Sequence, residues 1–427
     1  MRSNRWLRLL ALFAVLGLVA AACGDDDDDT ADGTTTTAAD DDIDVQPVAE
    51  GLIIGAILPE TGGLAEAGLG EPQIAAIQLA INDINAAGGV LGNDVTLLQG
   101  DEAGDEALAR EAAQRILGQG ANAIVGAAAS GMSQAIIQLL SDNQIPQCSG
   151  SNTSPAFTGQ ANADYYFRTV PPDEAVAPII ADEVAGDGHE NVVIVARADD
   201  YGTALATLVE GALDELGATV AANVTYDPDA TTFDAEVSQI TDANPDAVVV
   251  ISFGEGFPLI AGLLEAGISA DQMYGGDGIF GPATIEGVDP SDPNVVDGMK
   301  VIGAAGGAEF NERLAGDVSA GNYIYAGQVY DCAIIIALAA EISGSTDGAE
   351  FMDAVFDITR GGTECETFEE CKQLIEDGEE DINYNGASGP LELDDNGDPT
   401  VGRYAIGQFQ DGELVIIDDQ DVDVTAL

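Results

Sequence analysis

The sequence predicts an α/β protein built from two doubly wound parallel-sheet lobes. From Gly51 onward, short apolar strands alternate regularly with amphipathic helices, a pattern typical of parallel sheets covered by helices. The prolines Pro171 and Pro172 separate two such runs, because a helix rarely continues into a proline. A chain of 427 residues that is 46% hydrophobic is long enough for two core-bearing domains.

The first run has four strands with three helices between them, followed by an extended segment. We expect strands over 52–58, 95–98, 123–125 and 145–148, helices over 68–87 and 106–117 and from Ser130 onward, and an extended piece over 165–170. The helix over 68–87 carries isoleucines at roughly helical spacing and stops at Gly88-Gly89. A polar loop, 151–153, is expected to open one further helix.

The second run repeats the pattern. We expect helices over 173–185, 203–216, 233–242 and 257–266, and strands over 192–196, 219–224, 247–251 and 272–274. The C-terminal part is more mixed. We expect the chain to cross back toward the first unit at 300–305, and then to form helices over 323–342, 350–356 and 368–376. Strands over 404–409 and 414–417 are expected to be joined at Asp411-Gly412. Two similar units in series predict a ligand cleft between them.

The N-terminus predicts export and anchoring. Arg2, Arg5 and Arg8 precede an apolar run that ends at residue 22, which is too short for a confident spanning helix and is typical of a secretory signal peptide over 1–22. The run VAAAC, 19–23, resembles a bacterial lipobox, in which Cys23 becomes the lipidated first residue. Residues 23–50 are rich in Asp and Thr, so we expect a solvated tether between membrane and fold.

The composition is strongly acidic. The chain has 76 acidic and 12 basic residues and a net charge of −64; without the three signal-peptide arginines, nine basic residues remain and the net charge is −67. A field of this sign repels nucleic acid and anionic lipid surfaces, so neither is an expected partner. A saline or acid-rich habitat is a hypothesis that predicts stability rising with salt.

The four cysteines other than Cys23 form an even set in an exported chain. Cys365 and Cys371 are six residues apart in one local segment and are expected to be bridged. The sequence leaves open whether Cys148 and Cys332 form a disulfide or remain buried thiols.

Catalytic and metal-binding patterns are not found. The chain has one histidine, no G-x-S-x-G and no glycine-rich phosphate loop followed by Lys and Ser or Thr, so no nucleophile and base can be paired. The cluster DDNGD at 394–398 fails as an EF-hand because Pro399 and Ala405 stand where that loop needs Gly and Glu. We therefore expect no enzyme, no cofactor and no metal site. Sugar binding is not favoured because the only tryptophan, Trp6, lies in the signal peptide.

Two predicted strand ends carry hydroxyl side chains. Ser130 follows the strand over 123–125, and the loop 151–153 follows the strand over 145–148. Parallel strand ends meet at one sheet edge, where open α/β folds bind ligands, and hydroxyls with N–H groups at helix starts hold small anions. The same residues also suit ordinary helix caps and turns, since Ser154 precedes Pro155 at a helix start. The two roles are compatible, and a carboxylate is the expected anion.

Four segments in order resemble the type I periplasmic binding proteins of the branched-chain amino acid (Leu/Ile/Val) family. They are AINDINAAGGVLGNDVTLLQGDEAGD at 80–105, TSPAFT within 151–158, DDYG at 199–202 and SGPLELDDNGDP at 388–399. The resemblance covers about residues 50 to 420. Members of this family are the substrate-capturing lipoproteins of ABC importers.

The resemblance implies two lobes joined by a three-crossing hinge that closes on ligand. The crossings are expected near 169–172, 301–305 and 390–393. The N-terminal lobe would then comprise 51–169 and 303–389, and the C-terminal lobe 170–302 and 390–427.

The resemblance also implies a set of ligand residues. Ser130 and the loop Ser151, Asn152 and Thr153 match positions that hold the ligand α-carboxylate. Asp277, in GGDGIF, matches the acid that holds the α-ammonium, and Tyr201 matches a tyrosine that closes over the ligand from the second lobe. The segment SFGEGF at 252–257 matches a stretch that often carries an aromatic lining residue, so Phe253 and Glu255 are further candidates.

The expected function is capture without chemistry. The resemblance implies a monomeric lipoprotein on the outer face of the membrane that binds an amino acid of branched-chain type and delivers it to ABC permease subunits. The alternatives are a binding protein for urea, short amides, aromatic acids or another small carboxylate, and a ligand sensor on the same fold.

Overall fold

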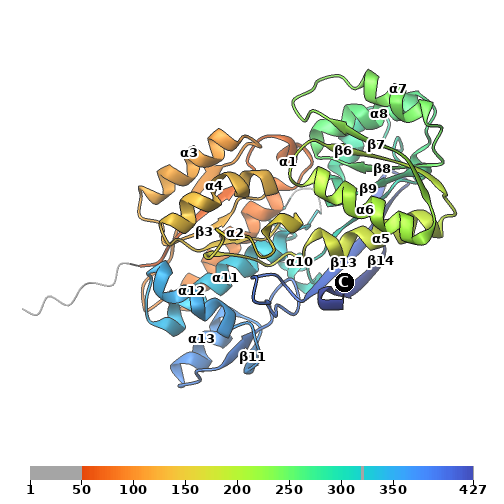
Figure 1. Ribbon diagram of the computed structural model, residues 1–427. Helices are drawn as coiled ribbons and strands as arrows, with labels where there is room; N and C mark the ends of the chain where they lie inside the picture. Colours follow the sequence, from red (N-terminus) through yellow and green to blue (C-terminus); the bar gives the residue numbers. More distant parts are fainter. Residues whose placement is uncertain (1–50, 319–321, 427) are drawn as a thin grey trace, which may run out of the picture. The chain divides into compact units, whose positions relative to one another are not determined.

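The computed structural model describes residues 51–318 and 322–426 (Figure 1). The predicted signal peptide, Cys23 and the acidic tether lie outside these residues. The described part of the chain contains two large sheets and one small one.

The first large sheet has five strands in the order β2-β1-β3-β4-β5. Every neighbouring pair is parallel. The strands are β1 (Ile53–Leu58), β2 (Thr96–Asp101), β3 (Ala123–Gly126), β4 (Gln147–Ser149) and β5 (Tyr166–Arg168). Neighbouring residues of β1 face different cores, since Ile57 packs with one hydrophobic cluster and Ala56 and Leu58 with the other. The sheet is therefore covered on both faces, as a doubly wound sheet requires.

Two groups of helices supply those cores. Helices α3 (Glu106–Leu117) and α4 (Ser130–Asp142) pack against each other, and α2 (Gly70–Ala86) packs against α11 (Ala326–Ser343). Helix α11 is long and apolar enough to cross a membrane by length and composition, yet 83% of it is buried inside the fold, which is typical of a core helix. The remaining helices of this part are α1 (Gly63–Glu66), α10 (Ala308–Leu314), α12 (Gly348–Asp357) and α13 (Phe368–Glu376).

The second large sheet has seven strands in the order β14-β13-β10-β9-β8-β6-β7. Strands β6 to β10 are parallel, and β13 and β14 run antiparallel as an edge hairpin. The strands are β6 (Asn191–Arg197), β7 (Thr219–Tyr226), β8 (Ala247–Ile251), β9 (Met273–Gly275), β10 (Lys300–Ala304), β13 (Val401–Gln410) and β14 (Glu413–Asp423). The hairpin turns at Asp411 and Gly412, both with positive φ, which confirms the turn predicted there.

Helices cover both faces of this sheet as well. The chain moves from β6 to β7 in one direction and from β7 back past β6 to β8 in the other. Because such crossovers are right-handed, the two connecting helices must lie on opposite faces. The helices are α5 (Asp173–Gly186), α6 (Gly202–Leu216), α7 (Asp234–Asp242), α8 (Phe257–Glu265) and α9 (Ala283–Val288). The predicted α/β class with two parallel sheets is confirmed.

The chain passes between the two sheets three times. It leaves the first sheet after β5, returns after β10, and crosses again between β12 and β13. Before the last passage, β11 (Thr363–Cys365) and β12 (Ile382–Tyr384) form a small parallel pair.

Both cysteine pairs are disulfides. Cys148 in β4 is bonded to Cys332 in α11, which ties the first sheet to its core helix, and Cys365 is bonded to Cys371 across β11 and α13. The question that the sequence left open for Cys148 and Cys332 is thereby answered for this structure.

Two expected helices differ in the structure. The helix expected after 151–153 is only a single 3-10 turn, Pro155–Phe157, although Ser154 caps it. It ends because Gly159 has a φ of +66° and the Thr158 hydroxyl donates to Asp398 Oδ2 at 2.5 Å. The helix expected over 323–342 begins three residues later, because Tyr325 adopts a left-handed conformation with a φ of +66°.

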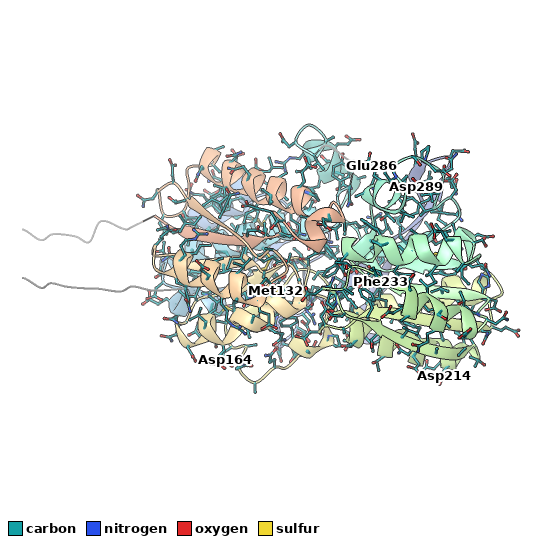
Figure 2. The ribbon with its side chains drawn as sticks, turned by 90° about the horizontal axis from the view of Figure 1, so that it is seen from above. Met132, Asp164, Asp214, Phe233, Glu286 and Asp289 are labelled. Carbon is teal, nitrogen blue, oxygen red and sulfur yellow. A yellow bond between two sulfur atoms is a disulfide. The ribbon has the colours of Figure 1, made fainter. Side chains whose placement is uncertain are left out.

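The acidic side chains lie mainly on the periphery. Asp164, Asp214, Glu286 and Asp289 extend outward in the view from above (Figure 2). Within residues 51–318 and 322–426, no group of three or more His, Cys, Asp and Glu side chains is arranged to hold a metal ion.

Candidate ligand-binding site

A small cavity between the two large sheets gathers six of the predicted ligand residues. Its wall comprises Ser130, Ser151, Thr153, Tyr201, Phe253 and Asp277, together with Leu64, Ala128, Ala129, Gly278 and Tyr325. The cavity has a volume of about 10 Å³, close to the minimum that one water molecule needs. An amino acid is larger, so these walls must separate before a ligand enters.

The hydroxyl side of the cavity comes from the ends of β3 and β4. Ser130 is the first residue of α4, and its Oγ accepts a long hydrogen bond from Ser154 N at 3.4 Å. Ser151 Oγ lies 3.0 Å from Ala128 O and 3.2 Å from Gln73 Oε1. A hydroxyl has one proton, so Ser151 can turn toward a ligand by giving up only one of these partners.

Asn152 is placed behind the cavity wall. Its Nδ2 donates to Ala127 O at 3.1 Å and Ala128 O at 2.8 Å, and its Oδ1 accepts from the Tyr166 hydroxyl at 3.1 Å. The side chain is fully buried and fastens the β3 and β4 loops to each other. The structure thus gives Asn152 a positioning role and brings Ser151 and Thr153 to the cavity.

Glu102, directly after β2, binds part of the backbone that was expected to bind the ligand carboxylate. Its carboxylate accepts from Ala128 N at 2.7 Å and Ala129 N at 3.2 Å. Complete burial raises the pKa of Glu102 to about 8, against the opposing effect of those two backbone hydrogen bonds. Backbone N–H groups that we expected to be free for a ligand, those of Ala128 and Ala129, therefore donate to a buried acid. The hydroxyl side chains consequently supply more of the donors for a ligand carboxylate.

The acidic side of the cavity centres on Asp277, which follows β9 and is 1% exposed. The Tyr201 hydroxyl donates to Asp277 Oδ1 at 2.6 Å, and the Tyr325 hydroxyl donates to Oδ2. Burial raises the pKa of Asp277, and the two tyrosine hydrogen bonds offset part of that rise. The sequence analysis missed Tyr325, whose left-handed backbone starts α11 beside this acid.

Phe253 and Glu255 have different positions. Phe253 lines the cavity and stacks on Tyr201, with ring centroids 5.3 Å apart, and the Arg197 guanidinium lies 3.7 Å from its ring centroid. Glu255 lies outside the cavity wall, where its Oε1 accepts from Arg197 Nη1 at 2.6 Å and the Tyr226 hydroxyl at 2.8 Å.

The two sides of the cavity touch at its rim. A Cβ added to Gly63 in α1 would lie 2.4 Å from Glu255 Oε2. A Cβ added to Gly254 would lie 2.7 Å from Glu66 Cβ and 2.9 Å from Gly63 O. Both glycines therefore allow a close approach that any larger residue would oppose. The described conformation is closed.

Asp173, the first residue of α5, is a second buried acid next to the site. It is 0% exposed, its backbone N donates to Thr153 O at 2.8 Å, and neither carboxylate oxygen has a hydrogen-bond partner within the described residues. The Thr153 side chain opposes the rise in the pKa of Asp173 that burial causes. Burial first, and the charge of Asp277 second, raise the pKa of Asp173.

The buried arginines near the site are already paired. Arg168 Nε lies 2.6 Å from Asp398 Oδ1, and its Nη1 donates to Asn152 O and Ser154 O. Arg197 forms ion pairs with Asp199 at 2.7 Å and Glu255 at 2.6 Å. A ligand carboxylate therefore meets neutral donors, and a ligand cation meets carboxylates.

The family is decided by comparison with known sequences. A sequence profile of the family described as periplasmic binding protein matches residues 52–413. The chain belongs to this family. This chain is 28% identical over 380 residues to the chemotactic signal transduction system substrate-binding protein BasB of Halobacterium salinarum. The alignment covers 86% of this chain and 88% of that protein.

Solved structures establish the fold type. A leucine-binding protein LivK of Thermotoga maritima superimposes with a TM-score of 0.72 and 23% identity, over 88% of this chain and 100% of the other. The substrate-binding protein LivJ of Streptococcus pneumoniae, solved with isoleucine, gives a TM-score of 0.71 and 21% identity, over 87% and 99%. This periplasmic binding protein accordingly has the type I fold.

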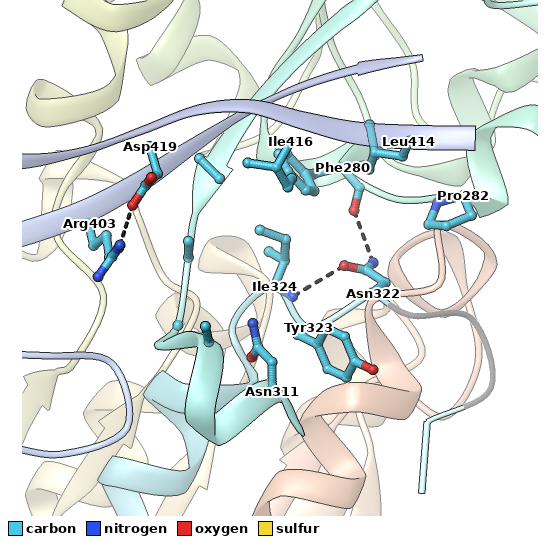
Figure 3. A pocket seen from close by; sticks show the side chains of 14 residues that line it. Phe280, Pro282, Asn311, Asn322, Tyr323, Ile324, Arg403, Leu414, Ile416 and Asp419 are labelled. Atoms are coloured by element: carbon cyan, nitrogen blue, oxygen red, sulfur yellow. Dashed lines mark hydrogen bonds and ion pairs between the residues drawn. The ribbon is translucent and has the colours of Figure 1, made fainter. Parts of the chain in front are cut away.

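A larger cavity of about 320 Å³ lies beside the site in this periplasmic binding protein (Figure 3). Phe280, Pro282, Tyr323, Leu414 and Ile416 form much of its apolar wall. It shares two chain segments with the ligand site, since Phe280 follows Asp277 and Ile324 precedes Tyr325. Among the described residues that line it, the charged ones are Arg403 and Asp419, which form an ion pair with each other. Because these two side chains pair with each other, the described part of this wall suits a zwitterion less well than the smaller cavity does.

Proposed function

We propose that this periplasmic binding protein captures a small α-amino acid of branched-chain type between two lobes that close like a hinge. The lobes are taken as 51–169 with 303–389 and 170–302 with 390–427. The observation that supports the proposal is the opposition, within one cavity, of the hydroxyls of Ser130, Ser151 and Thr153 and the carboxylate of Asp277. Neutral donors suit a carboxylate, and a buried carboxylate suits an ammonium.

The apolar part of the wall favours an aliphatic side chain. Leu64, Phe253 and the ring of Tyr201 supply apolar surface to the same cavity. Burying an aliphatic side chain there contributes about 25 cal/mol for each Å² removed from water. Glu255, which could have selected a cationic side chain, is already paired with Arg197.

Capture proceeds by a shift between open and closed populations. In the open form the ligand first meets the hydroxyls of the first lobe. Closure brings Tyr201 and Asp277 onto it, and the bound ligand stabilises the closed form by its extra contacts there. No bond is made or broken in this cycle.

The family and the N-terminal sequence support a proposal for the cellular role. Membership of the family supports an extracytoplasmic location, and Cys23 would carry the lipid that holds the protein at the membrane surface. We propose service to an ABC importer, with the permease subunits as partners. Sensing is a second candidate because the relative aligned over 86% of this chain is named as part of a chemotactic system. Uptake of labelled leucine by a strain that lacks the gene distinguishes the two roles. A role in import predicts that this strain loses uptake, whereas a role in sensing alone does not.

Calorimetric titration of the purified protein tests the ligand class. Leucine, isoleucine and valine should bind, while urea, acetamide and benzoate should not. Asp277→Asn should weaken leucine binding by more than about tenfold, because a buried ammonium loses its anion. The exposed Asp214→Asn is the matched control. Tight binding of an amide with no heat from amino acids would overturn the proposal.

A further inference from the structure

Strand β14 is an exposed sheet edge with an apolar surface. It is the last strand of the seven-stranded sheet and, within the described residues, pairs only with β13. The large hydrophobic side chains that are exposed in the described part of the chain include three in a row on this strand, Val415, Ile416 and Ile417, at 38%, 52% and 43% exposure. An edge strand offers unpaired N–H and C=O groups to another extended chain, and a long apolar edge is normally covered or interrupted. The edge of β14 therefore indicates a partner.

The hairpin geometry determines which backbone groups of β14 face outward. The turn consists of residues 411–412, and the pair that flanks it is Gln410 with Glu413. In a hairpin with such a short turn the flanking pair is hydrogen-bonded, and hydrogen-bonded and non-hydrogen-bonded pairs then alternate along the strands. Leu414 and Ile416 therefore direct their N–H and C=O groups away from β13, toward the free edge.

The cavity of about 320 Å³ opens beside the same strand. Leu414 and Ile416 line this cavity, and Ile416 is also half exposed, so the mouth of the cavity lies at β14. Figure 3 shows Ile416 on one wall and Ile324 and Tyr323 on the other. When a strand is added to a sheet edge, backbone hydrogen bonds give affinity and pockets for alternate side chains give specificity. This edge thus has a pocket in which a docked strand would place an apolar side chain.

The charge of β14 restricts the kind of partner. Residues 413–423 contain five acidic residues and no basic one, and of these acids only Asp419 forms an ion pair in the described structure, with Arg403. A second copy of this chain would bring the same acids and a mature net charge of −67, so repulsion disfavours self-association. A segment in which aliphatic residues alternate with Lys or Arg complements both the apolar and the acidic side chains of the edge.

We propose that β14 is the docking edge for an extended, basic and aliphatic segment of the membrane partner that receives the ligand. The segment adds a strand beside β14 and inserts one aliphatic side chain into the cavity. The cavity walls come from both proposed lobes, with Ile324 from the first and Ile416 from the second, so the shape of the cavity depends on closure. The docked segment consequently recognises the closed form. This dependence on closure rests on the proposed function.

Amide hydrogen exchange measured by NMR tests the docking edge. The probe is a synthetic peptide of about seven residues, capped at both ends, in which lysine alternates with valine around a central leucine. In about 0.1 M NaCl it should protect the N–H groups of Leu414 and Ile416 from exchange. A peptide in which glutamate replaces lysine is the control and should protect neither. Binding of the lysine peptide without protection at these two residues would mean general adsorption to an acidic surface and would overturn the proposal.

The variant Ile416→Thr tests the insertion into the cavity. Threonine keeps the β-branch that strands favour but removes apolar surface from the mouth of the cavity, so calorimetry should show that the peptide binds at least about fivefold more weakly. Leu216→Thr is the matched control, because Leu216 is 50% exposed at the end of α6, and it should leave the affinity unchanged. Equal affinities of the two variants contradict the insertion. A wild-type dimer that Ile416→Thr dissociates would assign the edge to a second copy of this chain and would also overturn the proposal.

Leucine separates this inference from the proposed function. Saturating leucine should raise the affinity for the peptide at least about fivefold, because it favours the closed form. If leucine does not bind, the proposed function fails, and the exchange protection at Leu414 and Ile416 alone decides whether β14 is a docking edge. If leucine binds and the affinity for the peptide does not change, the recognition of the closed form is wrong, whereas the capture of an amino acid stands.

Discussion

The hydroxyl of Tyr201 and the carboxylate of Asp277 are joined by a hydrogen bond of 2.6 Å. Tyr201 precedes α6 and Asp277 follows β9, so the bond links two loops at the carboxyl edge of the second sheet. Tyr325 donates to the other oxygen of the same carboxylate. A carboxylate can accept about four hydrogen bonds, so Asp277 retains capacity for a ligand ammonium while the tyrosines hold it in place.

Removing the Tyr201 hydroxyl should weaken ligand binding. A hydrogen bond to a charged group contributes about 1.5–3 kcal/mol, so Tyr201→Phe should lower the affinity for leucine about tenfold or more. The Phe253 stacking partner is kept by this change. Tyr274→Phe is the control, because it removes a 2.6 Å bond of the same kind to Asp187 away from the cavity. Equal affinities of the two variants in calorimetry would contradict a role for Tyr201 in the site.

A methyl group at Gly254 should hold the cleft open. Its Cβ would lie 2.7 Å from Glu66 Cβ and 2.9 Å from Ala67 N. Overpacking of this kind costs about 1–3 kcal/mol, and here it destabilises only the closed form, in which these atoms meet. Gly254→Ala should thus reduce leucine affinity about five- to 150-fold and enlarge the radius of gyration measured by X-ray scattering. Gly211→Ala in α6, where a Cβ meets nothing within 4 Å, should change neither.

Much of the fold could be predicted because its signal is local. The apolar run of β8 and the patterned surfaces of α3 and α13 gave element bounds that the structure reproduces without change. The two helices repeat with the period that burial of one face imposes, and β8 is a short continuous apolar run that is buried along its whole length. Because the ends of parallel strands meet at one sheet edge, the sequence also predicts that Ser130 and Thr153 lie together.

The parts of the site that sequence reasoning missed depend on tertiary packing. Tyr325 lies inside an apolar helical pattern, and a left-handed non-glycine residue leaves no mark in a sequence. Asp173 and Glu102 are two acids among 76, and only the folded chain distinguishes a buried carboxylate from a hydrated one. Glu255 was considered for its place in the loop, but Arg197, 58 residues away in sequence, engages it.

Stability should depend on the ionisation of Glu102. Its pKa is about 8 in the folded protein against an ordinary value of 4.5. A raised carboxyl pKa means that the ionised form is disfavoured by folding, so stability is lost as pH rises from about 4.5 to 8. Glu102→Gln cannot ionise and should become more stable relative to the wild type over that interval, measured by urea unfolding at pH 5, 6.5 and 8. The exposed Glu215→Gln should track the wild type, and a constant difference for Glu102→Gln would contradict the assignment.

Salt should stabilise the folded protein. A mature net charge of −67, from nine basic and 76 acidic residues, repels itself more strongly when the chain is compact. The screening length falls from about 10 Å at 0.1 M to about 3 Å at 1 M salt. The melting temperature should rise between these concentrations in NaCl. A melting temperature that is flat across the range would contradict the expectation of a salt-adapted surface.

The two disulfides should contribute unequally to stability. Cys148 and Cys332 are 184 residues apart in sequence, and Cys365 and Cys371 are six apart. The loop-entropy relation gives about 5 kcal/mol for the long loop and about 2 kcal/mol for the short one. The double variant Cys148→Ala with Cys332→Ala should therefore lose more unfolding free energy in urea than Cys365→Ala with Cys371→Ala. Because Cys332 lies in the core helix α11 and Cys148 at the strand end that leads to Ser151, the first variant should also bind leucine more weakly, and the second should not.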